Sequence, residues 1–406
     1  MKRLLSLLLA VAMLFALVAC GGNHDKQNHE GAENHGGTQK DHKDPKEPID
    51  EGPDRILWLT DMVDGDRYDT TVAYLEALCN ALGYNLTVVH GDAYNDAANN
   101  LLAVKNAVTA DSAGLIISQD GGLADIMEAY PQLWVAGFGT DMRSVYEKGG
   151  ENAACLENPK FLGTIAEGGY DGAVLGAVLA QQTIDAGFKK VALVIQPEFA
   201  HPAQTEAVEG YTTAIEEYNA ANPDDVITIV GQPTALLFGA LSEQWFLESG
   251  HSELDAIISF CEGLKLVYPT MVSAMEQGLC SEEMRLISVG FERDQSVTSD
   301  LGGGGRIYAL TVSRIENCAY PLILIDNAVH GKVAAGTENS CVDGTLCLID
   351  SAGDIADVMA NTMLGTGNVE DACLSVEKVV SLCGRNHPDL TWAGLIALFQ
   401  SFGAEG

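Results

Sequence analysis

Short apolar runs of strand length alternate with helix-forming segments along most of this chain. In the first half, the apolar runs fall at 56–60, 86–89, 114–118 and 134–138, and helical spacing falls at 68–81, 95–108 and 123–130. Fully apolar strands that alternate with helices are typical of a parallel sheet with both faces covered. The pattern therefore predicts an α/β fold.

The same alternation returns in the second half of the chain. Helices are predicted at 168–186, 205–219, 240–249 and 265–277, and strands at 190–196, 226–230, 256–260 and 286–289. Two consecutive units of this kind predict two doubly wound parallel-sheet lobes. Ligands of such folds bind at the carboxyl ends of the strands, so we expect a site between the lobes.

Several segments, taken in their order and spacing, resemble one protein family. They are SAGLII (112–117), EGGYD (167–171), DAIISF (255–260), ISVGFE (287–292) and IYALTV (307–312). Over residues 54–333 the chain resembles the type I periplasmic (solute-binding) proteins, which share their fold with LacI-type regulators. The resemblance implies a three-segment hinge, with the chain crossing between lobes near 161–163, 290–294 and 331–336, and closure of the lobes on a ligand.

These crossings divide the chain into two discontinuous lobes. The N-terminal lobe is expected to contain 54–161 and 291–331, and the C-terminal lobe 162–290 and 332–406. Residues from 340 onward extend past the usual end of the family. A strand at 345–349 and further helices are expected there, without an assigned role.

The first residues of the chain have the pattern of an export signal. Lys2 and Arg3 precede an apolar run, and LVAC at 17–20 is followed by two glycines. The apolar run is somewhat short for a membrane-spanning helix. LVAC resembles the lipobox of bacterial lipoproteins, which implies that 1–19 is a signal peptide and that Cys20 is acylated, as with palmitate. We expect a protein anchored by lipid to the cell membrane on its extracytoplasmic side. The alternative is an ordinary cleaved signal with an incidental cysteine.

Residues 20–53 form a polar linker after the expected anchor. This segment contains almost no apolar residues, so burial cannot offset the entropy lost on ordering. Four of the nine histidines fall here, at 24, 29, 35 and 42. A His-rich tract can bind zinc or copper weakly, but the spacing fits no fixed metal site. We interpret the segment as a disordered His- and Gly-rich tether.

The net charge excludes one large class of partners. The 406-residue chain carries a formal charge of −35, and its first 19 residues contribute two positive charges and no negative ones. The mature chain therefore carries −37, which is incompatible with binding a nucleic acid through its phosphates. At 47% hydrophobic and 19% charged residues, the chain can still bury a large core.

The cysteine pattern does not indicate a disulfide framework. Ten cysteines are present, nine remain after Cys20, and none forms a CxxC motif. Cys341 and Cys347 could meet across a turn, but buried free thiols are the simpler interpretation.

Loops after the predicted strands supply the candidate ligand-binding residues. Their carboxylates, amides and arginines can pair with a polar ligand, and their rings can pack on it. The candidates are Asp64, Asp66, Arg67, Tyr68, Gln119, Asp120, Asp141, Phe199, Gln204, Glu262, Glu292 and Arg293. For each one taken singly, an ordinary solvated loop residue is the alternative.

One position departs from the sugar-binding pattern of the family. Many relatives carry Asn-Asp after the strand that matches 255–260, whereas this chain has Cys261-Glu262. Glu292 stands where relatives often have Asp. Such an acidic cleft favours an amine-bearing or hydroxyl-rich ligand over a phosphate, although the ligand itself stays open.

The sequence favours a binding protein over an enzyme. It contains no nucleophile elbow, Walker loop or zinc motif, and we expect no catalytic residue, cofactor or metal. The resemblance implies a monomeric receptor that delivers a small polar ligand, such as a sugar or nucleoside, to an ABC-type permease. The alternatives are a ligand-sensing lipoprotein that reports to a membrane signalling partner, and a metal-capture protein that uses the His tract.

Overall fold

The structure is a computed structural model that describes most of the chain after the linker. It describes residues 54–139, 142–166, 172–198, 201–237, 239–293, 299–302, 304–334, 336–350 and 352–401. All of them lie within the compact unit Asp50–Gly406. The expected signal peptide, the Cys20 anchor and the His-rich linker lie outside the described residues.

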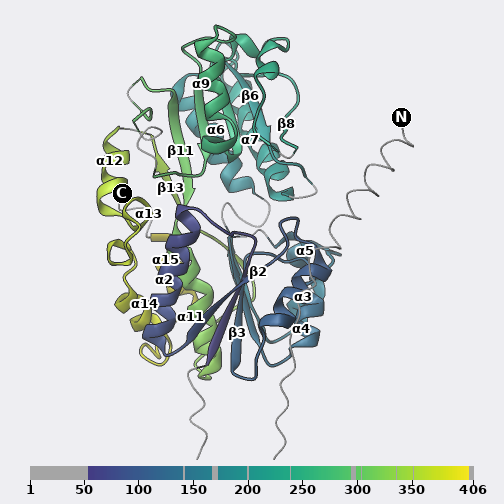
Figure 1. Ribbon diagram of the computed structural model, residues 1–406, viewed down its shortest axis with the longest axis vertical. Helices are drawn as coiled ribbons and strands as arrows, with labels where there is room; N and C mark the ends of the chain where they lie inside the picture. The colour runs from purple at the N-terminus through teal and green to yellow at the C-terminus, as the bar shows by residue number, and fades with distance from the viewer. Residues whose placement is uncertain are drawn as a thin grey trace, which may run out of the picture. The chain divides into compact units, whose positions relative to one another are not determined.

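A six-stranded sheet forms the centre of the N-terminal lobe (Figure 1). Its strand order is β12-β5-β4-β3-β1-β2, and every neighbouring pair is parallel. The strands are β1 (Arg55–Thr60), β2 (Asn85–His90), β3 (Ser112–Ile117), β4 (Trp134–Phe138), β5 (Phe161–Ala166) and β12 (Cys341–Asp343). The predicted apolar runs account for the first four.

Both faces of this sheet are covered by helices, as the fully apolar strands require. Along β1, Ile56 and Trp58 face one core, and Leu57 and Leu59 face the other. The first core is covered by α2 (Asp66–Leu82), α11 (Ala319–Val329), α14 (Val376–Leu382) and α15 (Trp392–Ser401). The second is covered by α3 (Ala97–Ala107), α4 (Leu123–Ala129) and α5 (Arg143–Tyr146), on the opposite side of the sheet in Figure 1.

A second sheet forms the centre of the C-terminal lobe. Its order is β13-β11-β10-β9-β6-β7, with β8 also paired to β6, and only the β11–β13 pair is antiparallel. The strands are β6 (Lys190–Ile195), β7 (Thr228–Ile229), β8 (Thr234–Ala235), β9 (Ala256–Glu262), β10 (Arg285–Val289), β11 (Ile307–Ser313) and β13 (Leu346–Ile349).

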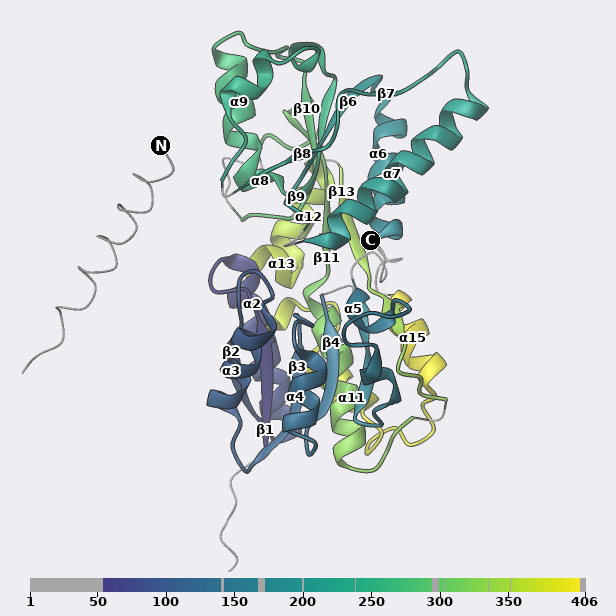
Figure 2. The same ribbon diagram turned by 90° about the vertical axis from the view of Figure 1, so that its right-hand side faces the viewer.

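Helices also cover both faces of the second sheet (Figure 2). On one side lie α6 (Ala173–Ala186) and α7 (Pro202–Ala221), and on the other lie α8 (Gly263–Leu266), α9 (Tyr268–Glu276) and α12 (Ala352–Asn361). The helix predicted at 240–249 is instead the short 3-10 helix Glu243–Leu247, and the strand predicted at 226–230 is only the two residues of β7. The fold is therefore α/β, with two parallel-dominated sheets, as predicted.

The chain crosses between the lobes at positions that differ from the expected ones. β5 continues in the first sheet to Ala166, and β11 belongs to the second sheet up to Ser313. The third crossing lies between β12 and β13, after Asp343. The range 291–331 thus divides between both lobes, because β11 pairs with β10 whereas α11 packs under the first sheet. The lobe to which a strand belongs depends on its pairing partners in the folded protein. The predicted boundaries differ because these partners cannot be read from the local sequence.

A fourth crossing occurs at Thr362, between α12 and α13 (Met363–Thr366). Ile355 and Val358 of α12 belong to a core of the C-terminal lobe, and Met363 belongs to a core of the N-terminal lobe. Leu364 packs against both cores. Residues 363–401 consequently complete the N-terminal lobe, where 332–406 had been expected to belong to the other lobe.

The nine cysteines after Cys20 are free in the structure. The buried ones are Cys79, Cys155, Cys261, Cys280, Cys318 and Cys383. Within the described ranges, no helix is long and apolar enough to cross a membrane. The same residues include no group of three or more His, Cys, Asp or Glu side chains that could hold a metal ion.

Candidate functional site

A cavity of about 530 Å³ lies where the strands of both sheets end. Its lining comes from the loops after β1, β4, β6, β9 and β10, so both lobes contribute to it. A neighbouring space of about 470 Å³ shares Asp61, His201 and Gln204 with the first. Together they form the cleft, whose size suits a small molecule.

The structure brings most of the predicted residues to the cleft. Those lining the larger space are Asp64, Asp66, Arg67, Gln204, Glu262 and Glu292, and those lining the neighbouring space are Gln119, Asp120 and Gln204. Tyr68 and Arg293 line neither space. Asp141 and Phe199 lie outside the described residues. The role of these side chains in binding a ligand stays a prediction.

The loop after β1 carries the first lobe's charges into the cleft. Met62 N donates to Thr60 Oγ1 at 3.1 Å, and Gly65 has a φ of 100°, which favours glycine. Asp66 then begins α2, where a carboxylate is favoured by the helix dipole. A Cβ placed on Gly65 would lie 3.8 Å from Lys265 Nζ, so a side chain of the second lobe reaches this loop.

Lys265 bridges two of the predicted acids. Its Nζ lies 3.0 Å from Glu292 Oε1 and 3.4 Å from Glu262 Oε2. Burial alone would lower the pKa of Lys265, but the hydrogen bond that it donates to Glu292 and the charge of Glu262 outweigh this effect and raise the pKa. Both second-lobe carboxylates therefore already have a cation beside them.

Asp61 and His201 face each other across the cleft. Asp61 is accessible from the cavity, yet surrounding protein removes enough solvent to raise the pKa of its carboxyl, with Glu262 adding to the effect and His201 opposing it. Burial lowers the pKa of His201, although Asp61 and Glu262 oppose this shift. Burial therefore disfavours the charged form of both Asp61 and His201.

Gln204 and Asp120 are held by protein partners. Gln204 Oε1 accepts from Gln196 N at 2.7 Å, and its Nε2 donates to Gln196 Oε1 at 3.0 Å. Asp120 is buried, and its carboxylate accepts from Asn95 Nδ2 at 2.7 Å and from the Ser144 hydroxyl. These bonds fix the shape of the cleft walls, which is a form of preorganisation.

Gln119 lies in the cleft wall, and Tyr68 packs behind it. Gln119 is buried, and its Nε2 donates to Asp92 O at 2.5 Å. The ring of Tyr68 stacks on Trp58, with centroids 6.2 Å apart, and lies 5.9 Å from the ring of His90. Tyr68 thus packs against the first lobe beneath the loop after β1.

Comparisons with solved structures identify the architecture. A glucose-galactose binding protein from Geobacillus stearothermophilus, GanP, aligns with a TM-score of 0.55 and 14% identity, over 74% of this chain and 98% of that one. An ABC transporter solute-binding protein from Agrobacterium vitis, bound with α-D-tagatopyranose, gives 0.56 and 14%, over 76% and 96%. A putative LacI transcriptional regulator from Bacteroides fragilis gives 0.55 and 11%, over 75% and 99%.

The chain has the type I periplasmic binding protein fold. The resemblance expected from the sequence is thereby confirmed at the level of the fold. No protein-family model and no curated protein matches the sequence. Identities of 10–14% establish shared architecture and nothing finer.

Within the described residues, two ion pairs join the lobes of this periplasmic binding protein fold beside the cleft. Arg293, in the loop after β10, pairs with Asp66 of the first lobe at 3.5 Å. Arg143 of α5 in the first lobe pairs with Glu206 of α7 in the second. Arg293 is therefore a contact between the lobes, which explains its absence from the cavity lining.

The cleft contains functional candidates that sequence reasoning did not single out. Asp61 and His201 fall in the loops that were considered, but nothing in their spacing distinguished them. Lys265 lies in the first turn of α8, three residues after Glu262, and this i to i+3 spacing was the available signal. Phe260 and Phe291 also line the larger space.

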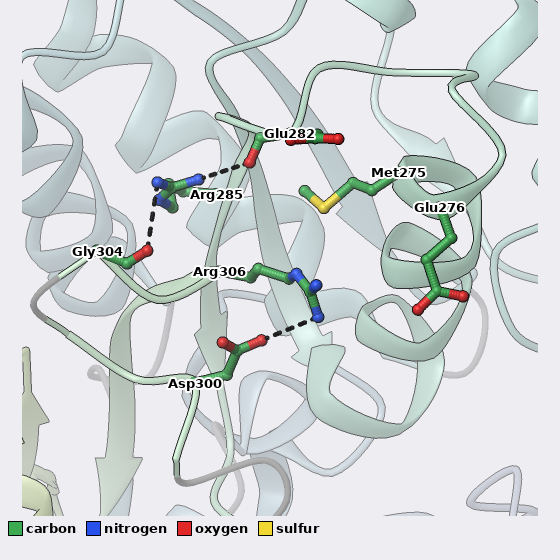
Figure 3. Close-up of a pocket in the computed structure, with 7 residues that line it drawn as sticks. All are labelled: Met275, Glu276, Glu282, Arg285, Asp300, Gly304 and Arg306. Atoms are coloured by element: carbon green, nitrogen blue, oxygen red, sulfur yellow. Dashed lines mark hydrogen bonds and ion pairs between the residues drawn. The ribbon is translucent and has the colours of Figure 1, made fainter.

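A third cavity, of about 300 Å³, lies in the C-terminal lobe (Figure 3). It is formed where β10 and β11 begin, which is the sheet edge opposite the cleft. Both of its arginines have protein partners: Arg306 Nη1 lies 3.4 Å from Asp300 Oδ2, and Arg285 donates to the backbone oxygen of Glu282 at 3.1 Å (Figure 3). Because ligands of this fold class bind at carboxyl ends of strands, we do not assign a ligand to this cavity.

Proposed function

We propose that this protein is an extracytoplasmic solute receptor whose two lobes close on a small polar ligand. The observation that carries the proposal is the cleft itself, because it lies at the carboxyl ends of both sheets and receives charged side chains from both lobes. Solved proteins of the same fold are described as binding glucose, galactose or tagatose, which supports a polar ligand such as a sugar or nucleoside.

Anchoring and delivery are the finer parts of the proposal. We infer from the lipobox-like LVAC sequence that Cys20 is acylated and holds the receptor at the outer side of the cell membrane. A receptor in that place would release its ligand to an ABC-type permease. Replacing Cys20 with Ala should move the protein from the membrane fraction to the soluble fraction and abolish the incorporation of labelled palmitate. Retention of both properties would refute the anchor.

Ligand binding itself is tested by a thermal-shift screen. The panel contains sugars, nucleosides and amino acids, and a ligand present at 100 times its Kd should stabilise the protein by about 2.7 kcal/mol. A Glu262→Ala variant tests whether the ligand binds in the cleft, because it removes a charged group from the cleft without changing either core. We expect the variant to fold normally and to lose most of the ligand-induced shift. A panel that stabilises neither protein would count against the proposed function.

A further inference from the structure

We propose, building on the proposed function, that the ligand carries a positively charged amine and that Asp61 receives it. The larger space of the cleft is lined by five carboxylates and two permanent cations. The carboxylates are Asp61, Asp64, Asp66, Glu262 and Glu292, and the cations are Arg67 and Lys265. A cavity with this balance attracts cations and repels anions.

Three of the five carboxylates already have a cation beside them. Lys265 already stands between Glu262 and Glu292, and Arg293 stands beside Asp66. Within the described part of the chain, Asp61 and Asp64 form no ion pair. Burial raises the pKa of the Cys318 thiol and the charge of Arg67 opposes this shift, so Arg67 lies near the core of the first lobe as well as the cleft.

Asp61 is better placed than Asp64 to contact a bound molecule. Asp61 lines both spaces of the cleft, whereas Asp64 lines only one. It faces His201 and Glu262 of the second lobe, so closure of the lobes encloses it. His201 is neutral at pH 7 because burial lowers its pKa, and it does not compensate the charge of Asp61.

An enclosed carboxylate needs a positive partner. Burying an unpaired charge is costly, and a neutral sugar hydroxyl supplies a hydrogen bond but no opposite charge. Phe291, which is half-buried, lines the same space, and its ring can pack on the apolar part of the ligand or face its ammonium group. This combination points to an amino sugar, an amino nucleoside or a similar amine-bearing solute.

The test compares molecules that differ in one amine. The Kd values of the full-length protein, purified in mild detergent, are measured by calorimetry for D-glucosamine against D-glucose, D-galactosamine against D-galactose, and 3′-amino-3′-deoxyadenosine against adenosine. We expect the amine to bind about thirtyfold more tightly than its neutral counterpart in at least one pair. If the closed cleft excludes solvent, added salt should reduce this preference only slightly.

Two variants assign the preference to one carboxylate. Asp61→Asn should reduce the amine preference to about threefold or less without lowering the melting temperature. Asp64→Asn, in the same loop, should retain most of the preference, because Asp64 lines only one of the two spaces. Equal or tighter binding of the neutral compounds, or an unchanged preference in Asp61→Asn, would overturn this inference and leave the receptor proposal standing. Failure of every compound, charged and neutral, would overturn the receptor proposal and this inference with it.

Discussion

The guanidinium of Arg293, which follows β10, is bound to the start of α2 through Asp66. Arg293 Nη1 lies 3.5 Å from Asp66 Oδ1, and Arg293 Nη2 donates to Asp66 O at 3.1 Å. The same guanidinium donates to Leu364 O at 2.9 Å, in the helix that follows the fourth crossing. One side chain thus joins a second-lobe loop, a first-lobe helix and the C-terminal extension.

Arg293→Ala should loosen the junction between the lobes. We expect the free energy of unfolding to fall by about 1–2 kcal/mol, as measured by urea denaturation. The Asp66 side chain is 42% exposed, so solvent screens the ion pair and the hydrogen bonds to backbone oxygens account for most of the loss. Arg293→Lys is the matched control, because it keeps the charge and loses the forked geometry. An unchanged stability in both variants would show that the contact is not formed in solution.

A buried carboxylate attaches the C-terminal extension to the first lobe. Asp326 of α11 has no exposed surface, and its Oδ1 lies 2.7 Å from Arg385 Nη2 and 3.0 Å from the Tyr84 hydroxyl. Arg385→Met would leave this charge buried without its closest cation. We expect a loss of about 3 kcal/mol in the free energy of unfolding.

A double variant distinguishes the loss of the Asp326–Arg385 ion pair from unspecific destabilisation by the substitution. Asp326→Asn in the Arg385→Met background removes the stranded charge and should recover part of the stability. Both measurements use chemical denaturation of the full-length protein. If Arg385→Met were as stable as the wild type, residues 363–401 would not be an integral part of the N-terminal lobe.

Asp61 should reduce the stability of the ligand-free protein at neutral pH. Burial raises the pKa of its carboxyl above the ordinary 3.8, so the folded state binds this proton more tightly than the unfolded chain does. Stability from this group is therefore present at low pH and is lost as the pH rises through the folded pKa. Asp61→Asn should melt at a higher temperature than the wild type at pH 7, and the difference should shrink as the pH falls toward 3.8.

The comparison needs a variant that removes one charge from the same loop. Asp64→Asn serves this purpose, because Asp64 lies in the same cleft loop and lines only one of the two cleft spaces. We expect a smaller change in melting temperature for it at pH 7. If Asp61→Asn melts lower than the wild type at pH 7, Asp61 stabilises the free protein and the assigned burial effect is wrong.

Thiol reactivity should follow burial along the chain. Burial raises the pKa of Cys79 to about 12 and that of Cys155 to about 11, whereas Cys373 is exposed. Alkylation of the native protein at pH 8, followed by mass spectrometry, should modify Cys373 first and the buried thiols only after denaturation. A pair of cysteines that resists alkylation even after denaturation without reductant would reveal a disulfide.

The strands that are buried on both faces of a sheet were predicted correctly from the sequence. β1, β3, β4 and β9 are continuous apolar runs, and such runs have few alternatives to a central parallel strand. Short or interrupted elements were predicted less well. The predicted helix at 265–277 divides into α8 and α9, because Pro269 lacks the N–H that would continue the hydrogen bonding.

The crossings and the extension depended on tertiary contacts. β12 is three residues long, and its place beside β5 follows from pairing rather than from its own composition. The sequence did indicate which loops line the cleft, because these loops follow the ends of predicted strands. The roles of Lys265 and Arg293 were not foreseen, because each is defined by a partner from a distant segment of the chain.

The central claim, closure of two lobes on a ligand, is tested most directly by small-angle X-ray scattering. The radius of gyration of the wild-type protein is measured without ligand and with the compound that gives the largest thermal shift. Because ligand shifts the equilibrium between open and closed lobes, we expect the radius to decrease on binding. A protein that binds the compound and keeps the same radius of gyration would contradict the account.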